Sequence, residues 1–352
     1  MGPLRVLIVD DSALVRQVLA EILSSDPVLE VVGSVSHPLG VIEAVERLQP
    51  DVVTLDVEMP GLDGLTLLRR LMQTRPVPVV MISSATESGC EATVRALELG
   101  ALDFVAKPRL DIRHGTEALG AEVIEKVKAA ARAKRNRPPG VYVQPPGEAP
   151  ARPGAAVKLI AIGASTGGTE ALRAVLAKLP EGAPPVLVAQ HMPAGFTRAF
   201  AGRLDSLCRI RVREAADGDP VAAGQCLVAP GGFHLELAPV RGGYCVRLTG
   251  DRQEKRHRPS VDRLFRSCAR WVGAGAVGVL LTGMGDDGAE GMLAMRHAGC
   301  RTIAQDEASS AVFGMPRAAI ERGAASEVVN LHRLAERLLA VNSPSYSAVD
   351  RR

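Results

Sequence analysis

Short apolar runs alternate with segments of helical period in the first third of the chain. In residues 14–23 apolar side chains recur every three or four positions, which indicates an amphipathic helix. Further helices are expected at 40–48, from 64, and at 91–99. The apolar runs have the length of buried strands and lie at 4–9, 29–33, 52–55, 78–82 and 104–105. Five strands separated by helices predict a doubly wound parallel α/β sheet.

The second half repeats the alternation with fewer, stronger runs. Apolar runs at 159–163, 185–190 and 276–281 each end in a glycine-rich or polar turn. Helical patterns follow two of these turns, the second at 289–297. Residues 218–248 instead contain short strand-like runs separated by tight turns. We therefore predict a second doubly wound parallel-sheet α/β domain that carries a β-hairpin insertion.

A basic and then Pro/Gly-rich stretch separates the two halves. A last helix of the first half is expected from 115 to about 135, and its tail is rich in Lys and Arg, a composition typical of a solvated face. Residues 137–154 are rich in Pro and Gly, which is typical of a linker. We predict a first domain at 1–125, a linker at 126–156 and a second domain at 157–345.

Composition narrows the class of protein. A length of 352 residues fits two domains, and a net charge of +3 gives no argument for a nucleic-acid or membrane partner. There is no apolar run of transmembrane length, and the N-terminus leads directly into a strand, so we expect a soluble cytoplasmic protein. The six cysteines lack metal-site spacing, which favours free buried thiols.

Five chemically active side chains follow the predicted strands of the first half. They are Asp10, Asp11, Asp56, Ser83 and Lys107. A single Asp at a strand end commonly caps the next helix. Five such residues at the carboxyl ends of one parallel sheet instead favour a site. Asp10, Asp11 and Asp56 offer the oxygen ligands that Mg²⁺ takes, Asp56 could accept a phosphoryl group, and Ser83 and Lys107 could hold its oxygens.

With the segments 59–64 and 107–108, these residues resemble the response-regulator receiver domain over about the first 125 residues. The resemblance implies a flavodoxin-like (βα)5 fold. It also implies an aspartyl-phosphate switch at Asp56 that is written by a histidine kinase. Phe104 stands at the family's aromatic switch position.

Ser165 occupies the centre of a G-x-S-x-G turn between a predicted strand and a predicted helix. Such a turn can expose a serine nucleophile beside the amides that open the next helix. Two other interpretations remain open from the turn alone: Ser165 caps the helix, or the loop holds a phosphate.

Two further strands of the second half end in polar residues. His191 follows the run at 185–190, and Asp286 and Asp287 follow the run at 276–281. A lone His at a strand end is often structural, and the carboxylates could form a second metal site. Convergence of the three strand ends would instead bring together a nucleophile, a base and an orienting carboxylate.

The second half closely resembles the chemotaxis protein-glutamate methylesterase family. The segments that carry the resemblance are 163–168, 190–196, 229–232, 257–262 and 281–288. It implies Ser165 as nucleophile, His191 as base, Asp287 as the carboxylate that orients His191, and an oxyanion contact from the backbone of Met284. Asp286 stands where the family motif varies and receives no role.

The same resemblance implies the reaction and the partners. Its substrate would be glutamate methyl esters on the cytoplasmic helices of chemoreceptors, and glutamine deamidation would be a second activity. A CheA-type histidine kinase would phosphorylate the first domain with Mg²⁺, whereas ester hydrolysis needs no cofactor. Nucleic acid and membrane insertion are not expected.

Two other classes compete with an enzyme. A DNA-binding regulator would need a C-terminal helix-turn-helix, but residues 157–340 alternate strands and helices. A binding module with a degenerate site would leave methanol release from a methylated receptor at background.

Overall fold

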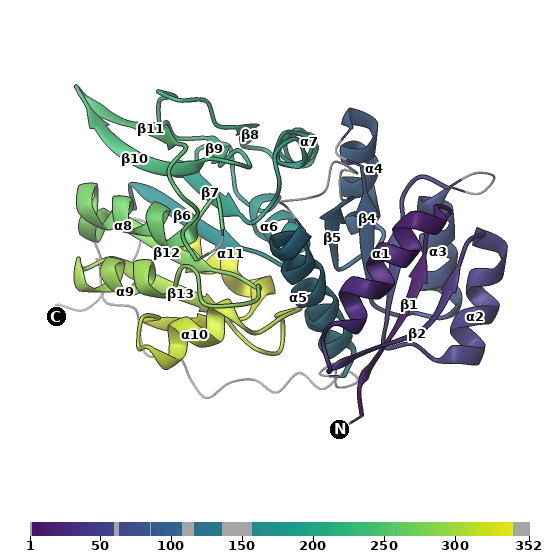
Figure 1. Cartoon of the computed structure of the whole chain (residues 1–352). Coiled ribbons are helices and arrows are strands. Elements are labelled where there is room, and N and C mark those ends of the chain that lie inside the picture. Colours follow the sequence, from purple (N-terminus) through teal and green to yellow (C-terminus); the bar gives the residue numbers. More distant parts are fainter. Residues whose placement is uncertain are drawn as a thin grey trace, which may run out of the picture. The chain divides into compact units, whose positions relative to one another are not determined.

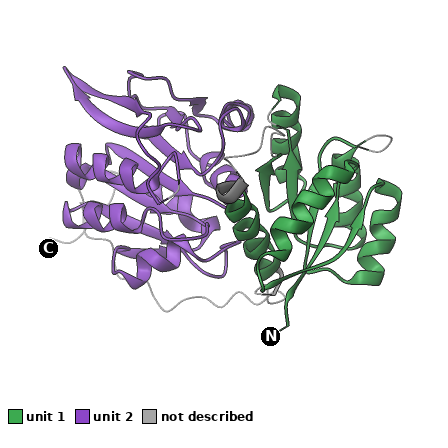
Figure 2. Ribbon diagram, viewed as in Figure 1, with its two compact units in different colours: residues 1–139 green, residues 140–352 purple. Residues whose placement is uncertain are grey.

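The computed structural model describes residues 2–59, 63–84, 86–107, 116–135, 157–255 and 257–340 (Figure 1). The chain divides into two compact units, residues 1–139 and 140–352 (Figure 2). No helix among the described residues is long and apolar enough to cross a membrane. The predicted linker beyond 135 and the predicted domain end at 345 lie outside the described residues.

The first unit is built on a parallel sheet in the order β2-β1-β3-β4-β5. The strands are β1 Leu4–Val9, β2 Leu29–Val35, β3 Val52–Asp56, β4 Val79–Ser83 and β5 Asp103–Ala106. This arrangement is the predicted doubly wound sheet. Strands β1, β3, β4 and β5 are largely buried because helices cover both faces of such a sheet, whereas the edge strand β2 is mostly half-buried or exposed.

The helices of the first unit are α1 Ala13–Ser24, α2 Val41–Leu48, α3 Gly64–Thr74, α4 Glu87–Glu98 and α5 Thr116–Arg135. A short 3-10 helix, η1, spans Pro38–Gly40. Leu19 and Leu23 of α1 join Val123 and Val127 of α5 in a core against one face of the sheet.

One expectation about these helices was wrong. Helix α4 begins at Glu87 rather than at 91, because the Thr86 side chain accepts a hydrogen bond from the Gly89 amide and caps a polar first turn. Helix α5 continues to Arg135, as the sequence predicts, and the domain boundary expected at 125 therefore falls inside this helix. Residues 126–135 therefore belong to the first unit and not to a linker.

The second unit contains a parallel sheet of seven strands in the order β14-β13-β12-β6-β7-β9-β8. The strands are β6 Leu159–Ala164, β7 Val186–Gln190, β8 Arg211–Glu214, β9 Gln225–Val228, β12 Ala276–Leu280, β13 Arg301–Gln305 and β14 Glu327–Val329. The central strand β6 lies between β7 and β12, so the residues that follow these three strands emerge at the same edge of the sheet.

The helices of this unit are α6 Gly168–Leu176, α7 Phe196–Asp205, α8 Val261–Trp271, α9 Ala289–His297, α10 Met315–Glu321 and α11 Leu331–Ala340, with the 3-10 helix η2 Gly273–Gly275. Buried residues of α8, α9 and α10 share a core with the sheet, and α6 lies beside α7 and α11 (Figure 1).

The predicted hairpin is confirmed. Strand β10 His234–Val240 pairs antiparallel with β11 Gly243–Thr249 and packs against α8. The run at 225–228, which the sequence places in the same insertion, is β9 and belongs to the main sheet. The described part of this unit is a parallel sheet with helices between its strands, which argues against a DNA-binding helix-turn-helix domain.

Candidate functional site

Strand register brings Ser165 and His191 to the same edge of the second sheet. Ala164 of β6 is paired with Gln190 of β7, and Ser165 and His191 are the next residues of these strands. The His191 amide donates to the Ala164 carbonyl over 3.1 Å. Neighbouring parallel strands lie roughly 4.8 Å apart, so the nucleophile and the base predicted from sequence leave the sheet side by side.

The turn at Ser165 requires glycine at two positions, Gly167 within it and Gly283 on the neighbouring loop. Gly167 has φ +74°, and α6 has no side-chain cap, so Ser165 does not cap this helix. Gly283 lies against the nucleophile: a Cβ there would come within 2.7 Å of the Ser165 Cβ and 2.3 Å of the Met315 sulfur. The Ser165 amide donates to Thr282 over 3.0 Å and thereby ties the turn to the end of β12.

The buried side chain of Gln190 links the nucleophile and the base. Its Nε2 donates to the Ser165 carbonyl over 3.0 Å and to the His191 carbonyl over 3.2 Å. These contacts of Gln190 could not be predicted from the sequence, because a Gln at the end of a buried strand does not reveal which carbonyls its amide reaches.

His191 and Asp287 form a buried pair. The distance between His191 Nε2 and Asp287 Oδ2 is 2.8 Å, and their side chains are 6% and 1% exposed. An ionised carboxylate only accepts hydrogen bonds, so Nε2 carries the proton and donates. The other ring nitrogen, Nδ1, is buried and has no hydrogen-bond partner among the described residues. It is the nitrogen left to act as a base.

Hydrogen bonds from His191 and from the N-terminus of α8 hold Asp287 in the ionised form. The amides of Val261 and Asp262 donate to its two oxygens over 2.7 and 3.1 Å, and the Ser260 hydroxyl donates over 2.9 Å. Burial alone would raise the pKa of Asp287. The bonds from His191 and from these amides reverse that effect and hold the pKa well below its usual range.

Asp286 points away from this pair. Its carboxylate lies 2.6 Å from the Arg322 guanidinium and 3.5 Å from the Lys255 ammonium, and its side chain is 42% exposed. The adjacent aspartates therefore diverge, which disfavours the metal site that sequence analysis left open here.

Met284 lies in the loop that follows β12. The amides of Gly314 and Met315 both donate to the Gly283 carbonyl, over 3.0 and 2.9 Å, and fix this loop. The Met284 amide donates to no other described residue. It is therefore available for an oxyanion, as the family resemblance implies.

His257 is a site residue to which sequence analysis gave no role. Its ring stacks on that of His191 with 3.7 Å between centroids and 9° between planes. Its place in the segment 257–262, which carries the family resemblance, was the one available signal.

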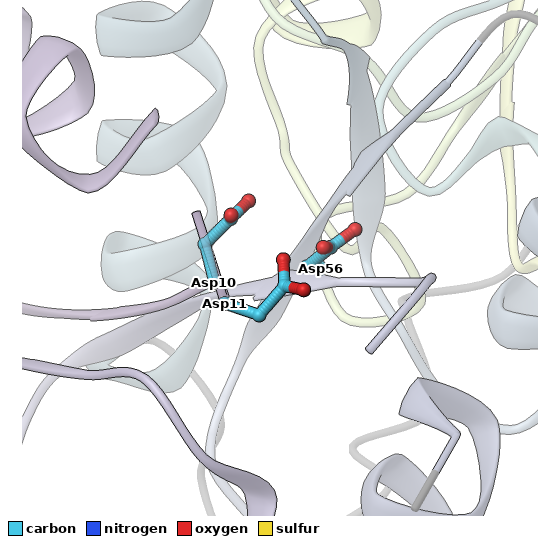
Figure 3. A group of neighbouring side chains, drawn as sticks. All are labelled: Asp10, Asp11 and Asp56. Atoms are coloured by element: carbon cyan, nitrogen blue, oxygen red, sulfur yellow. The ribbon is translucent and has the colours of Figure 1, made fainter. Parts of the chain in front are cut away.

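The first unit places its predicted acidic residues together. Ligand oxygens of Asp10, Asp11 and Asp56 all lie within 4.8 Å of one another (Figure 3). Lys107 Nζ is 2.7 Å from Asp56 Oδ2 and 3.3 Å from Asp10 Oδ2. Burial raises the pKa of Asp10 and of Asp56 despite Lys107. Further positive charge would therefore stabilise their ionised forms.

Ser83 ends β4 next to this cluster, but its hydroxyl faces α4. It accepts from Thr93 Oγ1 over 2.6 Å and donates to the Gly89 carbonyl over 3.1 Å. Phe104 is buried, and Lys126 Nζ lies 5.1 Å from its ring centroid. Residues 60–62 and 108, which contribute to the receiver resemblance, lie outside the described residues.

Comparison with known proteins identifies a family for each half of the chain, and both are the families that the sequence resembles. The family model for CheB methylesterase matches residues 160–338, and that for the response regulator receiver domain matches residues 6–119. The protein-glutamate methylesterase/protein-glutamine glutaminase 1 of Xanthomonas campestris is 52% identical over 350 residues, 97% of this chain and 98% of that protein. Its counterpart from Bordetella bronchiseptica is 52% identical over 340 residues, covering 96% of this chain and 97% of that protein.

Among solved structures, the Thermotoga maritima CheB methylesterase catalytic domain is similar to the second unit. The match has a TM-score of 0.52 and 37% identity, and it covers 53% of this chain and 100% of that domain. The chain thus belongs to the CheB methylesterase family and carries a response regulator receiver domain ahead of its methylesterase domain.

Proposed function

We propose that this chain is a phosphorylation-activated protein-glutamate methylesterase that hydrolyses glutamate methyl esters on chemoreceptors and also deamidates receptor glutamines. Its relatives carry both activities in their names. The observation that supports the proposal best is the His191–Asp287 pair, which leaves Nδ1 of a buried imidazole without a hydrogen bond among the described residues, on the strand next to that of Ser165.

Ester hydrolysis follows from this geometry. The Ser165 oxygen attacks the ester carbonyl while His191 Nδ1 takes its proton, and the imidazolium is stabilised by Asp287. When the tetrahedral intermediate collapses, His191 returns the proton to the departing methoxide, which leaves as methanol. His191 then takes a proton from water, whose oxygen attacks the acyl-enzyme, and returns this proton to the departing Ser165 oxygen, which releases the glutamate and restores the serine hydroxyl.

Backbone amides stabilise the oxyanion in both steps. Met284 supplies one candidate amide, and loss of a single such donor commonly costs about 3 kcal/mol. A glutamine side chain presents the same carbonyl with ammonia as the leaving group. The same residues would therefore perform the deamidation.

The receiver site has the residues for an aspartyl-phosphate switch. Asp56 would accept the phosphoryl group from a CheA-type histidine kinase. Asp10, Asp11 and Asp56 would hold Mg²⁺, because all three offer an oxygen and these oxygens lie within 4.8 Å of one another, with the Lys107 ammonium 3.3 Å from Asp10 Oδ2. Bound Mg²⁺ would neutralise phosphate charge. Lys107 would hold a phosphate oxygen, and Ser83 would join it after leaving Gly89 and Thr93.

We further propose that the unphosphorylated receiver restricts access to Ser165 and that phosphorylation relieves this restriction. Both ligand sites lie at the carboxyl ends of parallel sheets, and the Pro/Gly-rich segment 137–154 lies between the two domains in the sequence. An inter-domain interface is typically modest, so a change of a few kcal/mol would be enough to release it.

The nucleophile is tested by covalent labelling. A fluorophosphonate probe should label the wild-type chain at one serine, and Ser165→Ala should abolish that label together with ester hydrolysis. Labelling that persists in Ser165→Ala would contradict the assignment.

A further inference from the structure

A buried histidine lies behind the catalytic carboxylate. His234 is the first residue of β10 and is fully buried. The Ser260 amide donates to its Nδ1 over 3.1 Å, and its Nε2 lies 3.0 Å from the Arg252 carbonyl oxygen. Ser260 in turn donates its hydroxyl to Asp287. A continuous set of hydrogen bonds therefore connects His234 to the His191–Asp287 pair.

The two contacts of His234 define its tautomer. A backbone amide can only donate, so Nδ1 must be unprotonated and accept. A carbonyl oxygen can only accept, so Nε2 must carry the proton and donate. His234 is thus a neutral imidazole with both nitrogens engaged, and protonation of Nδ1 would break the bond to Ser260.

Ser260 is the residue through which His234 reaches the site. It is the N-cap of α8, and its hydroxyl also accepts from the Arg263 amide. Together with the amides of Val261 and Asp262, this hydroxyl makes three of the four bonds to Asp287. A shift of Ser260 would therefore move the first turn of α8 and the carboxylate that orients His191.

We propose that His234 is a positioning residue for ester hydrolysis: it anchors Ser260 and thereby holds Asp287 in the geometry that orients His191. The inference rests on the proposed function of Ser165, His191 and Asp287. His234 itself touches neither substrate nor nucleophile.

The surroundings of His234 keep it neutral. Burial lowers its pKa most, and Arg263 of α8 and Arg258 act in the same direction. The Arg252 carbonyl and Glu254 oppose these effects without reversing them. Thr249 lies opposite His234 on β11 and carries no charge, and Asp287 lies beyond Ser260. At neutral pH the anchoring tautomer is therefore the populated one.

Two amide variants separate the contacts, because each keeps one polar atom of the His234 ring at the same number of bonds from Cα. In His234→Asn, Oδ1 stands as many bonds from Cα as Nδ1 and can still accept from Ser260. In His234→Gln, Nε2 replaces the ring Nε2 and can still donate to Arg252, but the acceptor for Ser260 is lost. Turnover would be measured as methanol release from methylated receptor membranes by the full-length chain with acetyl phosphate, beside thermal unfolding of each variant.

We expect His234→Gln to lower kcat about 100-fold with KM nearly unchanged, since a misplacement near 1 Å can cost this much. His234→Asn should stay within about threefold of wild type. Wild-type kcat in His234→Gln, or equal losses in both variants, would overturn the proposal. The Ser165→Ala variant distinguishes failure of the proposed function from failure of this inference. Activity that persists in Ser165→Ala contradicts the proposed function. An inactive Ser165→Ala together with a fully active His234→Gln contradicts only the inference about His234.

A buried position can fail to fold when it is replaced, so a second measurement uses the wild-type chain. The ¹⁵N shifts of the His234 ring should show a protonated Nε2 and an unprotonated Nδ1 at neutral pH. A protonated Nδ1 would overturn the proposal, because the ring could not then accept from Ser260.

Discussion

At the residue scale, substitutions of the adjacent Asp286 and Asp287 should have opposite effects on turnover. Asp287→Asn keeps the shape but replaces an acceptor-only carboxylate by an amide that can hold His191 in the wrong tautomer. Turnover should fall about 10⁴-fold, as loss of a triad carboxylate does elsewhere. Asp286→Asn removes only partly exposed ion pairs with Arg322 and Lys255, which are typically worth about 0.2–1 kcal/mol.

Initial rates of methanol release from methylated membranes compare the two variants directly. Asp286→Asn should remain within about fivefold of wild type, since 1 kcal/mol changes a rate constant by roughly that factor. A large loss in Asp286→Asn with a small one in Asp287→Asn would show that the wrong carboxylate has been assigned.

Asp56 carries the prediction for the receiver. Asp56→Asn removes the nucleophilic oxygen and one of three grouped carboxylates, so acid-labile phosphate from acetyl phosphate should disappear. Mg²⁺ should also bind more weakly. Glu58→Gln is the control, because Glu58 lies two residues away outside the cluster of three. Wild-type labelling of Asp56→Asn would mean that another residue accepts the phosphoryl group.

The residues of both sites could largely be predicted from sequence because parallel strands deliver their carboxyl ends to one edge. Ser165 and His191 leave neighbouring strands at one edge for this reason, and His191 contacts Asp287. The roles of Gln190 and His234 could not be predicted, because they depend on side-chain directions within buried layers. The hydroxyl of Ser83 likewise faces α4, which its position at the end of β4 did not reveal.

At the element scale, the turn after β6 requires a glycine on the neighbouring loop. Gly283→Ala would place a methyl group within 2.7 Å of the Ser165 Cβ and 2.3 Å of the Met315 sulfur. Overpacking of this kind typically costs about 1–3 kcal/mol, and here it would also displace the nucleophile. We expect a lower melting temperature and lower turnover of the folded protein.

Gly202 is the matched control for this substitution. It lies within α7, and a Cβ there would meet no atom within 4 Å. Gly202→Ala should stabilise the protein by about 0.5–1 kcal/mol and leave turnover unchanged, because alanine is the better helix former. Equal turnover of Gly283→Ala and wild type would show that the turn tolerates displacement.

The bounds of helices and strands were predicted well where apolar residues recur regularly, and poorly where polar residues determine the start of an element. Helix α9 has the predicted bounds because its pattern begins at Ala289. Helix α4 was predicted too short because its first turn is polar and its start depends on the Thr86 cap. The place of β9 in the main sheet depends on pairing with β7 and β8, which a short apolar run does not specify.

At the scale of the whole molecule, the second unit should function without the first. It has its own sheet and core, and it is similar to the Thermotoga maritima CheB methylesterase catalytic domain, of which there is a crystal structure. If the receiver restricts access to Ser165, a fragment from Val157 onward should hydrolyse methylated receptor faster than the unphosphorylated full-length chain. It should also be insensitive to acetyl phosphate. A folded fragment that is no more active than the unphosphorylated full-length chain would contradict this restriction. Phosphorylation would then have to act by positioning catalytic residues or by recruiting substrate.

The most direct test of the account is methanol release from methylated receptor membranes by the full-length chain, with and without acetyl phosphate. We predict release above background without the phosphodonor, a marked increase with it, and no release by Ser165→Ala under either condition. Background release by the wild-type chain in both conditions would contradict the proposed activity. Release that is unaffected by acetyl phosphate, although Asp56 is labelled, would contradict the control by phosphorylation.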